Sequence, residues 1–70
     1  MSNKTVGLYA KPSFGKEWTI VEMRENGGET NIRNCQGEPR ITNSNNHAII
    51  HYANGIKDMY SFDTQHFRGL

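Results

Sequence analysis

Apolar residues come in short runs of strand length, separated by glycine, proline and asparagine, which predicts β-strands joined by tight turns. The clearest strand is 17–24 (EWTIVEMR), where both faces are partly apolar, as expected for a strand in the middle of a small sheet or at an interface. Further strands are predicted at 5–10, 29–35 and 40–42. No run of ten or more residues has the apolar periodicity of a helix.

A β-hairpin is predicted around Asn54-Gly55, because this dipeptide tolerates the positive φ angles of a two-residue turn. Such a turn places Ala53 opposite Ile56, and its register sets which side chains share a face of the hairpin. One face, with Ile49, Tyr60 and Phe62, would close the core. A three-residue turn that includes Ala53 would change every pairing.

The two ends of the chain give weaker signals. Residues 1–4 are polar and are expected to fray. Residues 63–67 are expected to form one helical turn, with Asp63 capping the amides that follow it. Phe67 and Leu70 would then fold back on the core.

Length and composition indicate one marginally stable domain, spanning 1–70. A chain of 70 residues buries only about 60% of its unfolded surface, and its single cysteine, Cys35, excludes an internal disulfide. Close packing or a homodimer or larger oligomer would supply the missing stability. The formal net charge is +1, and no signal peptide or membrane-spanning run is present, so a soluble cytoplasmic protein is expected.

Two segments resemble parts of SH3-like barrels. Residues 6–10 (VGLYA) are similar to the opening strand of SH3 domains, and 59–63 followed by 65–67 resembles the last strand and helical turn of SH3, KOW and Tudor barrels. The resemblance implies an all-β, SH3-like small barrel of about five short antiparallel strands. The acidic loop, paired tryptophans and proline of the SH3 peptide groove are absent, so no binding residue carries over.

Catalysis and metal binding have little support in the sequence. Cys35, His51 and Asp58 are the residue types of a nucleophile, a base and an orienting acid, yet Cys35 lies in no recognisable motif and a structural thiol is favoured. His47 and His51 would lie ~13 Å apart on a strand, too far to share a metal, so no metal or cofactor is expected. A homo-oligomeric enzyme with a site between subunits is the third interpretation.

The favoured interpretation is a small non-enzymatic protein-binding module, of the inhibitor or adaptor type found among phage- and plasmid-encoded factors. Large apolar and aromatic side chains anchor such interfaces. The residues expected to contact the protein partner are Phe14, Ile50, Tyr52, Lys57 and Met59.

A nucleic-acid-binding small barrel is the alternative interpretation. Aromatic side chains would stack on bases while nearby cations contact the backbone. The candidate cations are Lys11, Lys16, Arg33, Arg40 and Lys57. The near-neutral charge argues against this alternative, because nucleic-acid-binding domains usually show a clustered basic face.

Overall fold

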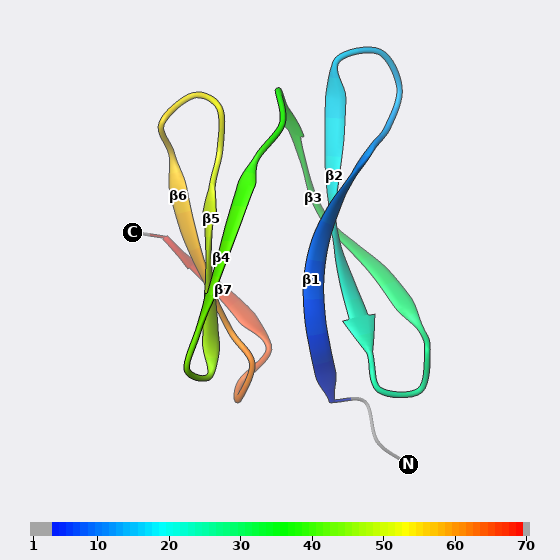
Figure 1. The fold of residues 1–70 in the computed structure, drawn as a ribbon, viewed down its shortest axis with the longest axis vertical. Coiled ribbons are helices and arrows are strands. Elements are labelled where there is room, and N and C mark those ends of the chain that lie inside the picture. Colours follow the sequence, from blue (N-terminus) through cyan, green and yellow to red (C-terminus); the bar gives the residue numbers. More distant parts are fainter. Residues whose placement is uncertain (1–3, 70) are drawn as a thin grey trace.

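A computed structural model describes residues 4–69 as seven antiparallel strands, with no helix in that range (Figure 1). The prediction of an all-β chain is confirmed, with two more strands than expected. The strands are β1 (Thr5–Pro12), β2 (Glu17–Arg24), β3 (Glu29–Gln36), β4 (Arg40–Ser44), β5 (His47–His51), β6 (Lys57–Ser61) and β7 (His66–Gly69). The described part of the chain holds no helix long and apolar enough to cross a bilayer.

The strands form two sheets, in the orders β1-β2-β3 and β4-β5-β6-β7 (Figure 1). Over the described residues the sheets do not close into a barrel, so the expected SH3-like barrel is replaced by two separate antiparallel sheets. The chain crosses between them through 37–39. Gly37 (φ +77°) lies so close to the β5–β6 turn that a Cβ there would be 2.6 Å from the Ala53 Cβ. The crossing therefore needs a glycine, and it ends one sheet and starts the other.

The β5–β6 hairpin has a three-residue turn, and the predicted two-residue register is wrong. The Tyr52 amide donates to the Ile56 carbonyl at 2.8 Å, and the Gly55 amide donates to the Tyr52 carbonyl at 3.0 Å. Gly55 takes the positive φ of +88°, and the Asn54 side chain accepts from the Ile56 amide at 3.0 Å. Asn-Gly therefore forms the last two positions of a longer turn that begins at Ala53.

The new register changes which side chains share a face. Ile50 now pairs with Asp58, and both are buried, while Tyr52 also points into the core. Lys57 and Met59 lie on the opposite, outer face. The expected face containing Ile50, Tyr52, Lys57 and Met59 therefore does not exist. Ile49, expected in the core, lies on the outer face as well.

The predicted helical turn at 63–67 is also wrong. The Gln65 amide donates to the Ser61 carbonyl at 2.6 Å, which closes a tight turn, and Gln65 has a φ of +56°. The chain then continues as β7, where Phe67 pairs with Tyr60 and their rings meet edge to face at 5.5 Å. Pairing with β6 and burial of Phe67 outweigh one turn of helix, which is only marginally stable alone.

The ends of the chain are described only in part. Residues 1–3 and Leu70 lie outside the described residues, and so do the predictions made for them. Lys4 is tied to the sheet, because its carbonyl accepts a hydrogen bond of 2.7 Å from the Glu25 amide. Phe67 packs against the core as expected.

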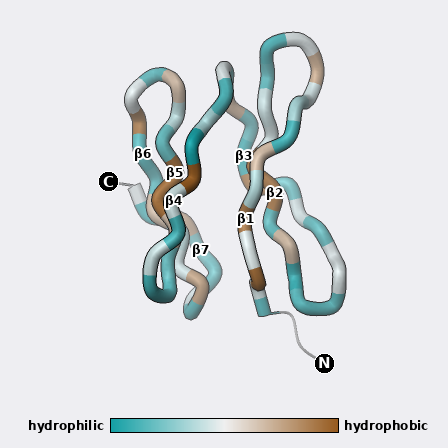
Figure 2. The backbone as a smooth tube through the Cα atoms, viewed as in Figure 1, coloured by the Kyte–Doolittle hydropathy of each residue, from teal (hydrophilic) through white to brown (hydrophobic). Residues whose placement is uncertain are grey.

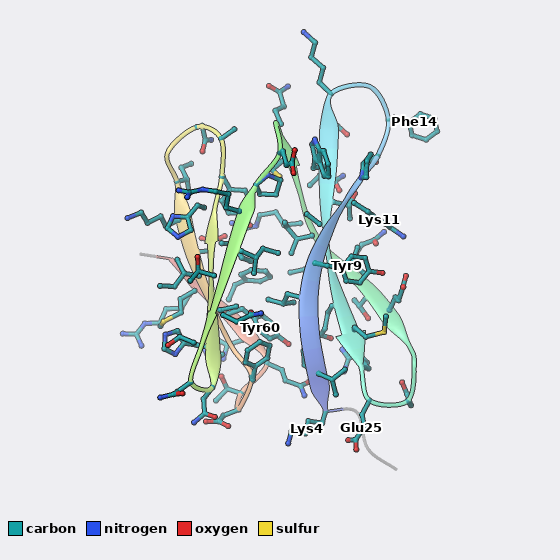
Figure 3. All side chains as sticks on the ribbon, viewed as in Figure 1. Lys4, Tyr9, Lys11, Phe14, Glu25 and Tyr60 are labelled. Carbon is teal, nitrogen blue, oxygen red and sulfur yellow. The ribbon has the colours of Figure 1, made fainter. Side chains whose placement is uncertain are left out.

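The core lies between the two sheets. Figure 2 shows hydrophobic segments near the middle of both sheets, and Figure 3 shows Tyr60 between them. The central cluster is Leu8, Ile20, Ala48, Ile50, Tyr52 and Tyr60. Tyr60 is only 2% exposed and meets the Phe62 ring edge to face at 5.7 Å. Alternation places Ile20 of β2 and Ala48 and Ile50 of β5 on the inner faces of their sheets, so the two inner faces share one core.

Two buried carboxylates connect the sheets. Glu22 of β2 accepts a hydrogen bond from the Tyr60 hydroxyl of β6 and pairs with Arg24 at 2.5 Å. Asp58 of β6 pairs with Arg33 of β3, whose guanidinium lies 5.1 Å from the centre of the Phe67 ring. Removing the partner of either carboxylate would leave a buried negative charge without compensation, so these contacts fix how the sheets pack.

Candidate binding face

The outer face of the four-stranded sheet consists of three cross-strand rows. In the first row, Arg40 pairs with His51 and His51 pairs with Lys57. The second row, through the middle, is Thr42, Ile49, Met59 and Arg68; the third is Ser44, His47, Ser61 and His66. We call these eleven residues the basic face. Adjacent rows are two residues apart, so the face measures about 14 Å along the strands and about 14 Å across them.

The basic face carries no carboxylate. Asp58 is the single acidic residue in the four strands β4 to β7, and it points inwards to Arg33. The face holds Arg40, Lys57 and Arg68 together with all three histidines of the chain. Figure 3 shows several nitrogen-tipped side chains projecting from this sheet on the side away from β1–β3. A chain with a formal net charge of +1 therefore presents one strongly basic surface.

The outer face of the three-stranded sheet has a different character. The Tyr9 hydroxyl of β1 donates to Glu29 of β3, and the Lys11 ammonium lies 3.7 Å from the same carboxylate. Thr19 of β2 donates to the Asn34 side chain at 2.9 Å. Val21 of β2, which pairs with Tyr9, is completely buried. Side chains on this face pair with one another, so its charges are already compensated.

The candidate cations of the nucleic-acid interpretation lie in several places. Lys11 pairs with Glu29, Arg33 pairs with Asp58, and Lys16 lies in the β1–β2 turn. Arg40 and Lys57 do lie together, one on each side of His51. The structure thus brings together two of the five candidate cations.

Sequence reasoning missed Arg68 and the three histidines as members of this face. The signal was present as alternation: R-T-S at 40, 42 and 44, H-I-H at 47, 49 and 51, and K-M-S at 57, 59 and 61. Reading it needed the hairpin register, because a one-residue slip moves every side chain to the other face.

The residues expected to bind a protein are also dispersed. Ile50 is fully buried and Tyr52 is 8% exposed, whereas Lys57 and Met59 belong to the basic face. Phe14 stands apart at the tip of the β1–β2 hairpin, where it is 90% exposed and points away from the body of the protein (Figure 3). Its turn is closed by hydrogen bonds, since the Glu17 amide donates to the Phe14 carbonyl at 3.1 Å.

Cys35, His51 and Asp58 do not meet in a catalytic arrangement. Asp58 is buried with Arg33, and His51 is on the opposite face of the sheet. Cys35 borders a pocket of about 280 Å³ beside Tyr52 and Ile56, where burial raises the pKa of its thiol. A raised pKa leaves less thiolate at neutral pH and so weakens the nucleophile. Within residues 4–69, no three His, Cys, Asp or Glu side chains come together as a metal-binding group.

Comparison with known proteins returns no match. No family model matches the chain, and neither the curated proteins nor the solved structures include a significant match. The resemblance to SH3-like barrels therefore reduces to a small, all-β antiparallel fold.

Proposed function

We propose that the protein is a non-enzymatic binding module that holds single-stranded nucleic acid on the basic face. The observation that carries the proposal is charge segregation: three cations and three histidines occupy a sheet face that has no carboxylate. Phosphate groups are the natural counterions of such a surface, and their contacts supply most of the affinity in non-specific nucleic-acid binding.

The central row of the face suits bases better than a duplex backbone. Ile49 and Met59 form an apolar strip, and Arg68 at the end of that row offers a planar guanidinium. Bases of a single strand stack on histidine rings and guanidinium planes, and they contact apolar side chains when they are splayed out. Serine and threonine hydroxyls at Thr42, Ser44 and Ser61 add hydrogen-bonding groups for phosphate or sugar.

The test measures binding of short single-stranded oligonucleotides by fluorescence anisotropy. Neutralising about three phosphates predicts a slope near −2 in a plot of log affinity against log salt, between about 50 and 200 mM salt. A triple variant, R40Q/K57Q/R68Q, should flatten this slope and weaken binding at low salt by at least about tenfold.

The matched control is Lys16→Glu, a charge reversal in the β1–β2 turn, away from the basic face. We expect this variant to change the affinity by less than about twofold, whereas Lys57→Glu on the face should lower it strongly. Equal affinities for the wild type and the triple variant would overturn the proposal.

A second candidate function, binding of a protein partner, is favoured by Phe14. A phenyl ring that is 90% exposed on a hydrogen-bonded turn is held ready for an apolar pocket, at little further entropic expense. An adaptor or inhibitor would use this hairpin tip as its anchor. Affinity capture with wild-type protein, Phe14→Ala and the exposed-residue control Val6→Ala tests it. A specific partner should be captured by the wild type and Val6→Ala but not by Phe14→Ala. Capture of the same partner by Phe14→Ala would contradict a binding role for the hairpin tip.

A further inference from the structure

One corner of the basic face is a pocket of about 270 Å³. The pocket lies at the end of the third row that is next to the β4–β5 turn and the β6–β7 turn. Both turns contribute residues to its wall. The polar lining residues are Asn46, His47, Ser61, Thr64, His66 and Arg68, and Met59 of the central row completes it. Its volume is near the lower limit for ligand pockets, which suits a small group rather than a large organic ligand.

The chemistry of the lining is that of an anion site. His47, His66 and Arg68 offer imidazole and guanidinium N–H groups, and Ser61 and Thr64 offer hydroxyls. No carboxylate lines the pocket. The Thr64 amide lies 3.4 Å from the Ser61 hydroxyl oxygen, an arrangement in which that oxygen accepts and its own proton is available to a ligand.

The backbone at this corner is held in uncommon conformations. Asn46 (φ +58°) and Gln65 (φ +56°) are the two non-glycine residues with positive φ in the described chain, and they belong to the two turns that form the pocket wall. The Phe62 amide donates to the Asn46 carbonyl at 2.7 Å and so joins the two turns. Such conformations are energetically unfavourable and persist where the surrounding structure holds them.

We propose that this pocket binds the terminal phosphate of a nucleic-acid strand lying on the basic face. A phosphate monoester carries three acceptor oxygens and a charge of about −1.5 to −2 at pH 7, which matches several converging donors better than an internal diester does. The two turns close the face at this end, so a strand that crosses it from the Arg40 row finishes at the pocket. The inference rests on the proposed function, because it assigns an end to the strand bound there.

The test compares one oligonucleotide sequence in three forms: with a 5′-phosphate, with a 3′-phosphate, and with hydroxyl groups at both ends. The wild type should bind one phosphorylated form about tenfold more tightly than the hydroxyl form, since charge-assisted hydrogen bonds to the extra group are gained. Inorganic phosphate in excess should remove this preference without displacing the hydroxyl form.

Variants locate the effect. His66→Gln combined with Thr64→Ala should remove the phosphate preference, so that the three forms bind with equal affinity, and any loss shared by all three forms reports on the contribution of His66 to the basic face. Both side chains are exposed, so folding should be preserved, which circular dichroism checks. The matched control, Lys57→Gln in the row farthest from the pocket, should weaken all three forms and keep the preference.

The outcomes separate the two proposals. Equal binding of the three forms by the wild type, or a preference that survives His66→Gln/Thr64→Ala, overturns the proposal that the pocket binds a terminal phosphate. The proposal that the basic face binds nucleic acid would still stand. Absence of binding by every form overturns the proposed function and the strand-end assignment together. A phosphoserine peptide that binds as tightly as the phosphorylated oligonucleotide would overturn the assignment to nucleic acid.

Discussion

The outer faces of the two sheets differ in whether their positive charges are compensated by carboxylates. On the three-stranded sheet, Glu29 accepts a hydrogen bond from Tyr9 and pairs with Lys11, which compensates the cation. On the four-stranded sheet, Arg40 and Lys57 lie on either side of His51, and neither forms an ion pair with a carboxylate of the described residues. The difference arises because Asp58, the one acidic residue of β4 to β7, falls at an inward position of the strand alternation. Net charge averaged over the chain hides this asymmetry, so the distribution of charge is the more informative property.

The largest expected effect concerns the interior that both sheets share. Arg33→Ala leaves the buried Asp58 carboxylate without its guanidinium partner, so we expect the free energy of unfolding to fall by about 3 kcal/mol in urea titrations. The exposed basic control, Lys16→Ala in the β1–β2 turn, should change it by less than about 0.5 kcal/mol. Similar small losses for both variants would show that the pair does not hold the sheets together.

Tyr60→Phe should have the next largest effect. This change keeps the ring contacts with Phe62 and Phe67 but removes the hydroxyl that donates to buried Glu22. We expect a loss of about 2 kcal/mol, because a buried carboxylate then lacks one of its donors. Tyr9→Phe, which removes the exposed hydroxyl bonded to Glu29, is the control and should lose clearly less stability than Tyr60→Phe. If Tyr9→Phe lowered the free energy of unfolding as much as Tyr60→Phe does, the buried hydroxyl would matter no more than the exposed one.

Tyr52 should make stability depend on alkaline pH. Burial, and next the charge of Asp58, raise the pKa of Tyr52 from its ordinary 10.0 to about 12. Because the folded state holds this proton more tightly, the stabilisation is complete below pH 10 and is lost as the pH rises from about 10 to about 12. We expect a difference of about 1 kcal/mol between wild type and Tyr52→Phe across this interval, measured by urea titration. Parallel curves for the two proteins would contradict the raised pKa.

The smallest effects compare the two outer faces directly. Glu29→Gln removes the partner of Lys11 and should lower the free energy of unfolding by about 0.5 kcal/mol. Lys57→Gln relieves repulsion on the basic face and should raise it by a few tenths of a kcal/mol, even though it weakens binding. Both changes should fade at high salt, because exposed charges are then screened. Effects of the same sign at low salt would show that the two faces do not differ.

Short-range patterns in the sequence determined the all-β character, the strand at 17–24 and the turn at Asn54-Gly55, because alternation and turn chemistry are local properties. Tertiary structure decided the rest. Whether Ala53 belongs to the turn is a difference of one residue, settled by the burial of Ile50, Tyr52 and Tyr60 in one core. Pairing with β6 placed 66–69 in the strand β7, where a helical turn was expected, and the strands divided into two sheets that are joined at 37–39, where contact with Ala53 requires Gly37. The basic face follows from that register, since only paired strands place side chains from distant parts of the chain in a common row.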